Sequence, residues 1–170
     1  MSEFPRPVEI SRLPPGDSLF EIAAAPTERA ALARRFGLLA LDRLEARVAL
    51  VPLAGGLLRL TAALSADVQQ ECVVTLAPVA NRVEERFSLV YGARDHEDEV
   101  VLDGEAELVE PLAGDTLDLG EAVAQQLSLA LDTYPRAAGV EAALPVESAK
   151  VSPFAVLVEG KEGADHRGDR

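Results

Sequence analysis

The chain has 170 residues, 48% of them apolar, and a formal net charge of −13, which predicts one acidic globular domain with a sizeable core. A single cysteine excludes an internal disulfide and a multi-cysteine metal site. With 4% aromatic residues and no tryptophan, few side chains could stack on single-stranded nucleic acid. The first residues show no basic leader or apolar stretch, and no apolar run approaches the ~20 residues that cross a bilayer. We therefore expect a cytoplasmic protein without a membrane segment.

Two strands with a helix between them are predicted in the first part of the chain. Residues 17–25 have the pattern of a strand, and Thr27 and Gly37 are suited to cap a helix over residues 28–36. From residue 41 to residue 51 apolar and charged side chains alternate, which predicts a half-buried strand.

A long hairpin is predicted next. After a turn at residues 54–56, every even position from Leu58 to Leu76 except Gln70 is apolar, which predicts one long strand with an unbroken register. A turn at Ala77-Pro78 leads to a returning strand with an apolar face of Val83, Phe87, Leu89 and Tyr91. The centre of the fold is therefore predicted to be an antiparallel meander.

A second helix follows an acidic stretch. Residues 92–104 are polar and predict a loop, and residues 105–110 predict a short edge strand. Asp118, with Glu121 three residues later, predicts a capped helix start. The buried stripe of this helix is predicted to consist of Leu119, Val123, Leu127 and Leu131.

These elements predict an α+β fold, in which an antiparallel β meander that could curl into a partial barrel is combined with two main helices. We expect a single domain over residues 1–158. Residues 159–170 are rich in glycine and charge and predict a disordered tail.

The net charge is concentrated in one block. Between Asp95 and Pro135 there are twelve acidic residues and no lysine or arginine, whereas the rest of the chain is nearly neutral. Such a surface attracts basic partners and repels phosphate backbones, so DNA is not expected as a partner. The residues predicted to form this partner-binding acidic surface are Asp95, Glu97, Asp98, Glu99, Asp103, Glu105, Glu107, Glu121 and Gln125.

The same carboxylates suggest an alternative function. Acids of the loop together with Asp115 or Asp118 could hold two divalent ions in a metal-dependent hydrolase or nuclease. The spacing does not match an EF-hand, and the acids lie mostly on one stretch of chain. Capping explains Asp118 and Glu121, and the position of Cys72 on an apolar strand face indicates a structural thiol. We therefore predict no catalytic residue, no metal site and no cofactor.

Three segments resemble the YceD family of large ribosomal RNA subunit accumulation proteins, namely residues 71–78, 117–131 and 152–157. The resemblance implies a non-enzymatic role in ribosome biogenesis that supports large-subunit ribosomal RNA. Many family members carry a Cys-x-x-Cys pair in the hairpin turn and a further cysteine after the helix. Here Cys72 is followed by Thr75 at the second place, and no cysteine follows the helix, so a tetrahedral zinc site cannot be assembled.

The resemblance and the charge together predict a basic ribosomal protein or maturation factor as the partner. The C-terminal motif, Pro153, Phe154, Val156 and Leu157, is either a second partner contact or a patch that docks on the sheet, and the resemblance favours the contact. Direct binding of RNA is the less favoured prediction for the partner. It would use cations on the polar faces of adjacent strands, Arg43, Arg47 and Arg59, which are equally well explained as scattered solubilising charges.

Overall fold

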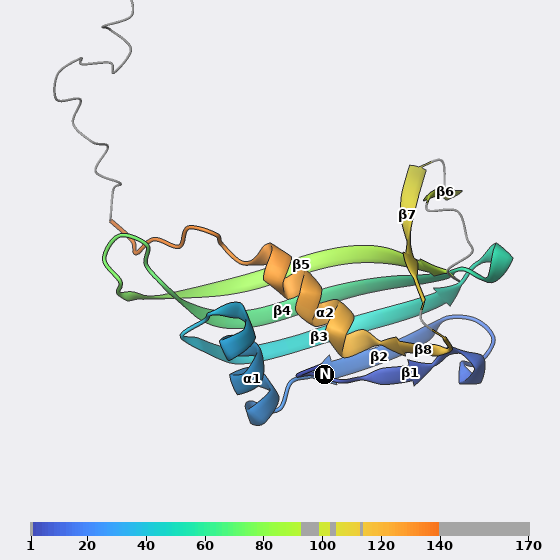
Figure 1. Ribbon diagram of the computed structural model, residues 1–170, viewed down its shortest axis with the longest axis horizontal. Coiled ribbons are helices and arrows are strands. Elements are labelled where there is room, and N and C mark those ends of the chain that lie inside the picture. The colour runs from blue at the N-terminus through green and yellow to red at the C-terminus, as the bar shows by residue number, and fades with distance from the viewer. Residues whose placement is uncertain (1, 93–98, 103–104, 113, 140–170) are drawn as a thin grey trace, which may run out of the picture. The chain divides into compact units, whose positions relative to one another are not determined.

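Two helices pack against one face of an open, mostly antiparallel sheet (Figure 1). The computed structural model describes residues 2–92, 99–102, 105–112 and 114–139. The chain divides into two units, Met1–Ala138 and Gly139–Arg170, and every helix and strand in the described residues belongs to the first unit. The predicted domain boundary at residue 158 and the predicted tail lie outside the described residues.

The sheet has the strand order β2-β3-β4-β5-β7-β6, and a separate two-stranded sheet joins β1 to β8. All pairs are antiparallel except β5 with β7. The elements are β1 (Pro7–Glu9), β2 (Ser18–Ala23), α1 (Pro26–Phe36), β3 (Ala40–Pro52), β4 (Leu58–Glu71), β5 (Pro78–Gly92), β6 (Glu99–Leu102), β7 (Glu105–Pro111), β8 (Thr116–Asp118) and α2 (Leu119–Ala130), with short 3-10 turns at Ile10–Arg12 and Ala54–Gly56. The predicted α+β fold with two helices is confirmed. The sheet does not close into a barrel, since β2 and β6 form its two edges.

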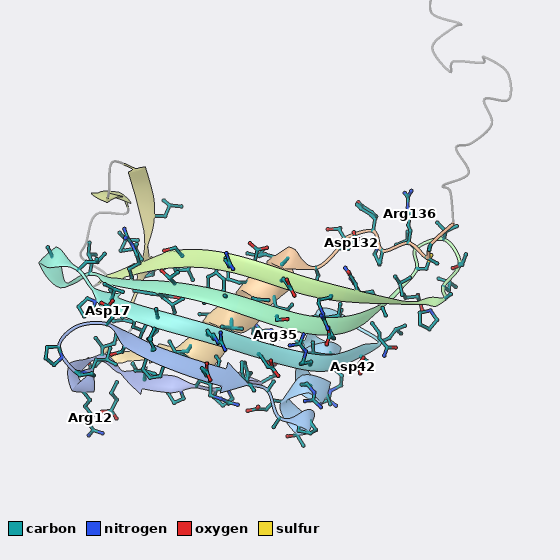
Figure 2. The ribbon with its side chains drawn as sticks, turned by 180° about the vertical axis from the view of Figure 1, so that it is seen from behind. Arg12, Asp17, Arg35, Asp42, Asp132 and Arg136 are labelled. Carbon is teal, nitrogen blue, oxygen red and sulfur yellow. The ribbon has the colours of Figure 1, made fainter. Side chains whose placement is uncertain are left out.

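The core lies between the sheet and the helices. The even positions of β4 from Leu58 to Val68 are buried, and α1 packs against β3 while α2 crosses β4 and β5 (Figure 1). On α2 the predicted stripe is confirmed, because Leu119, Val123 and Leu127 are buried and Leu131 packs at the margin of the core. The opposite side of β2–β5, here called the outer face, is not covered by α1 or α2, and Figure 2 shows it in front of the helices.

Two strand predictions are wrong. The long strand ends at Glu71 rather than Leu76, because the chain turns through Cys72 to Ala77 and Leu76 takes a left-handed φ of 60°. The expected loop over residues 92–104 contains β6, and β6 rather than β7 forms that edge of the sheet. The strand β7 instead lies between β5 and β6 and runs parallel to β5.

The helix caps differ in detail from the prediction. The helix α1 starts earlier than expected, with Ala25 as N-cap in place of Thr27, and the Glu28 side chain accepts a hydrogen bond from Ala25 N at 2.7 Å. Gly37 ends α1 with a left-handed φ of 67°, as predicted. Asp118 caps α2 as predicted, accepting from the backbone N of residues 120 and 121.

The N-terminal segment, residues 2–9, was not recognised in the sequence as part of the core. Phe4 is completely buried, and its carbonyl group passes so close to Gly120 that a Cβ there would lie 1.7 Å from the oxygen. Arg6 N donates to Asp118 Oδ1 at 2.8 Å, and Leu119 N donates to the Arg6 carbonyl at 3.0 Å. The guanidinium of Arg6 also pairs with Glu28 of α1 at 2.8 Å. This segment therefore joins α1 to α2.

Candidate functional site

The predicted acidic surface is divided by the structure. Glu99 lies in β6, and Glu105 and Glu107 lie in β7, which is attached to the sheet where Val90 to Gly92 of β5 pair with Val109 to Pro111. The remaining loop acids, Asp95, Glu97, Asp98 and Asp103, lie outside the described residues. The structure thus places three of the predicted acids on an arm formed by β6 and β7, here called the acidic arm.

Glu121 and Gln125 belong to a different environment. Glu121 Oε1 forms an ion pair with Arg35 of α1 at 2.7 Å, and Arg35 also pairs with Glu3 at 2.8 Å. The Arg35 guanidinium lowers the pKa of Glu121 and of Glu3. Gln125 donates to Glu121 Oε1 at 3.2 Å. The charge of Glu121 is therefore compensated inside the fold, where it links α2 to α1 and the N-terminal segment.

Asp115 and Asp118, considered above for a metal-dependent hydrolase, both have structural hydrogen bonds. Asp115 accepts from Ser11 N at 3.0 Å and from the Ser11 hydroxyl, and Asp118 caps α2. Among the described residues no group of three or more metal-ligating side chains is brought together. Neither carboxylate is directed to a shared ion position in this part of the structure.

The three arginines considered for RNA binding do share the outer face, at odd positions of β3 and β4. Arg43 pairs with Asp67 at 2.8 Å and with Glu45 at 3.1 Å, and Arg47 pairs with Glu21 at 3.0 Å. Arg59, further along β4, is half-buried. Carboxylates are thus interleaved with the cations of this face, so a phosphate backbone would meet both signs of charge.

The turn between β4 and β5 is held by backbone pairing around the Cys72 side chain. Cys72 N donates to Ala77 O, and Leu76 N donates to Cys72 O, each at 2.9 Å. The chain after α2 is bound to the same turn, since Val73 N donates to Pro135 O at 2.9 Å and Ala137 N donates to Cys72 Sγ at 3.4 Å. The buried sulfur therefore joins two segments that lie far apart in sequence.

This geometry joins the first segment on which the sequence resemblance rests, residues 71–78, to the chain that follows the second. A family profile described as "Large ribosomal RNA subunit accumulation protein YceD" matches residues 60–162. The chain belongs to the YceD family. No curated protein and no solved structure matches it.

The YceD match covers the β4–β5 hairpin, the acidic arm, α2 and the C-terminal motif. The N-terminal segment, α1 and β3 lie before the matched residues, although they pack against matched elements. The C-terminal motif lies outside the described residues. No helix in the described ranges is long and apolar enough to span a bilayer.

Within the YceD match, the hairpin turn exposes apolar side chains that the sequence pattern predicts to lie in a strand. Val73 and Val74 are about half exposed, and Leu76 is 67% exposed. Tyr134, next to the Pro135 carbonyl that accepts from Val73, is 69% exposed. The Ala77-Pro78 pair in the sequence indicated a turn. The alternating apolar residues before it continue the strand pattern, so the residue at which the turn begins could not be predicted.

We expect the thiol of Cys72 to titrate far below an ordinary cysteine. Hydrogen bonds from the Thr75 side chain and from the backbone N–H groups of Ala137, Thr75 and Val74 lower the pKa of the Cys72 thiol to about 6. Because the folded state favours the thiolate, this stabilisation is present above the unfolded pKa of about 8.5 and is lost as the pH falls through about 6. Thiolate absorbance at 240 nm, followed against pH, measures the midpoint.

The same titration in urea should show a midpoint near 8.5, and Thr75→Val should raise the midpoint of the folded protein. The stability difference between the natural chain and Cys72→Ala should be larger at pH 9 than at pH 6. A folded-state midpoint equal to the midpoint in urea would show that these hydrogen bonds do not favour the thiolate.

Proposed function

We propose that this protein supports large-subunit ribosomal RNA accumulation as a non-catalytic cytoplasmic factor. It would bind a basic ribosomal protein or maturation factor on the stretch from Asp95 to Glu110, here called the acidic block. Membership of the YceD family supports the process. The charge distribution supports the mode of binding, because a cationic protein is attracted to a uniformly acidic surface and is released as salt rises.

One observation carries the proposal. Elsewhere in the described chain several arginines and carboxylates are paired within the fold, as in Arg35 with Glu121 and Arg43 with Asp67. From Asp95 to Glu110, by contrast, there are eight acidic residues and no lysine or arginine. Arg94, directly before this stretch, is the nearest lysine or arginine in sequence, so most of the acids have no neighbouring cation in sequence and provide the charge that a basic partner needs.

The C-terminal motif is proposed as a second, apolar contact for the same partner. Pro153, Phe154, Val156 and Leu157 fall inside the YceD match, and an apolar anchor beside a charged surface would slow dissociation after electrostatic encounter. Direct RNA binding through Arg43 and Arg47 is less favoured, because each already pairs with a carboxylate on the outer face.

The test is recovery of partners from growing cells with the full-length tagged protein at about 50 mM NaCl, with and without RNase. We expect a basic protein that survives RNase treatment. The variant Glu97→Gln/Asp98→Asn/Glu99→Gln should reduce its recovery about tenfold, since three attractive charges are removed.

A control with the same charge change uses exposed acids outside the block, Asp17→Asn, Glu71→Gln and Glu85→Gln. This control should retain the partner. If large-subunit precursor RNA is recovered only in the absence of RNase, the protein binds RNA directly. Equal loss in both variants would show that net charge, rather than the acidic block, governs the interaction.

A further inference from the structure

The outer face of β2–β5 is open over most of its width. Its exposed side chains include Ala23, Ala63 and Leu19, the last of them 81% exposed. Small residues along β4 leave a hollow of about 670 Å³ that reaches from Glu21 of β2 to Arg86 of β5. No helix in the described part of the chain covers this face (Figure 2).

The strand register arranges the charges of the outer face in rows that cross the strands. One row, here called the basic row, takes one residue from each of β2 to β5 and consists of Glu21, Arg47, Ala63 and Arg86. The neighbouring row, here called the acidic row, consists of Ala23, Glu45, Ser65 and Glu84. Two arginines and one glutamate give the basic row +1, and two glutamates give the acidic row −2.

We propose that the outer face is a self-complementary surface on which a second copy of this chain docks. A two-fold axis that lies in the face, parallel to the rows and between them, places the basic row of each copy over the acidic row of the other. Each strand then lies over the same strand of the second copy. Arg47 faces Glu45 of the second copy, and Arg86 faces Glu84 of the second copy, so the symmetry generates four ion pairs.

Other two-fold arrangements are less favourable. An axis parallel to the strands and midway between β3 and β4 would reverse each row over itself. Glu21 would then face Arg86 of the second copy, but Arg47 and Glu45 would face uncharged residues of β4, so two ion pairs would form in place of four. With the proposed axis, the next row on one side, which contains Arg43, Asp67 and Arg82, faces an uncharged row that contains Ala49, Thr61 and Ser88. With this axis, therefore, none of these rows faces a row of the same charge.

The charges that face one another are available for new partners. Within the described residues neither Arg86 nor Glu84 forms an ion pair. The pair between Arg47 and Glu21 is solvent-exposed, with 83% and 77% of the two side chains accessible, so it can rearrange at little cost. Among the described residues Glu45 forms an ion pair with Arg43 alone, and Arg43 forms a shorter ion pair with Asp67.

The area is sufficient for a dimer. The strands β3, β4 and β5 have 13, 14 and 15 residues, and β2 has 6. At about 4.8 Å per strand and about 3.3 Å per residue the face measures on the order of 700 Å², close to the ~800 Å² that each partner contributes to a stable interface. The hollow beside Ala63 and Ser65 gives the long charged side chains of the second copy room between the sheets.

Sedimentation equilibrium of the full chain, at about 1 to about 200 μM and about 0.05 M NaCl, tests the proposal. We expect a monomer–dimer equilibrium that shifts to monomer at about 0.5 M NaCl. Arg86→Glu should weaken the dimer about tenfold, because two symmetry-related ion pairs become repulsive. Glu84→Arg should do the same.

The charge-swapped double variant, Arg86→Glu/Glu84→Arg, restores opposite charges across the axis and should recover the dimer. Arg34→Glu, an equal charge reversal at an exposed position of α1, should leave it unchanged. Circular dichroism checks that each variant is folded. A protein that is monomeric at every concentration in low salt, or a dimer insensitive to both single reversals, would overturn the proposal, and neither result bears on the acidic block.

Discussion

Gly120→Ala is expected to destabilise the protein by about 3 kcal/mol, although alanine is normally the better helix former by about 1 kcal/mol. The reason is the N-terminal segment, since the added Cβ would lie 1.7 Å from the Phe4 carbonyl oxygen. That oxygen belongs to the backbone and cannot move away by a change of rotamer. Urea denaturation of the two proteins measures the difference in free energy of unfolding.

The sign of this effect identifies its cause. In a chain that begins at Pro7, the Phe4 carbonyl is absent, so Gly120→Ala should become neutral or stabilising because only helix propensity remains. Phe4→Ala in the full chain should not relieve the clash, because it leaves the carbonyl oxygen in place. A stabilising effect of Gly120→Ala in the full-length protein would refute the close approach.

The same substitution at two leucines of α2 is expected to change the stability by very different amounts. Leu127 is completely buried, so Leu127→Ala should cost about 2–5 kcal/mol of stability through lost apolar burial and the cavity that remains. Leu129 is 76% exposed, and Leu129→Ala should change the stability by less than about 0.5 kcal/mol. Thermal or urea denaturation of both variants gives the comparison.

Because the two positions lie on one helix and lose the same atoms, helix propensity cancels between them. A cost of more than about 1 kcal/mol for Leu129→Ala would show that this side chain is covered in the whole protein. Equal costs at the two positions would contradict the orientation of α2 on β4 and β5.

Short-range patterns in the sequence were sufficient to predict where a helix starts and which face of a helix or strand is buried. The four-residue spacing of α2 and the Asp118 cap predicted its start and its buried face, and the alternation in β3 and β4 predicted which residues enter the core. These features depend on neighbours within one or two turns of the chain. They are therefore readable without knowledge of the tertiary structure.

Longer-range contacts were not readable in this way. The sequence predicts Glu121 as part of the helix cap and of the acidic surface, whereas its ion-pair partner Arg35 lies 86 positions earlier in the chain. The position of β7 between β5 and β6 depends on a parallel pairing that alternation does not encode. The end of β4 was misplaced because Cys72, Val74 and Leu76 continue the strand pattern into the turn.

The hairpin turn and the acidic arm lie near opposite ends of β5. From Pro78 to the β7 pairing at Val90 there are twelve residue steps, or about 40 Å at about 3.3 Å per residue. A folded protein of about 100 residues has a radius of gyration of about 13 Å and does not reach across that span. The length of β5 therefore keeps the hairpin turn and the acidic arm too far apart for one compact protein of that size to contact both.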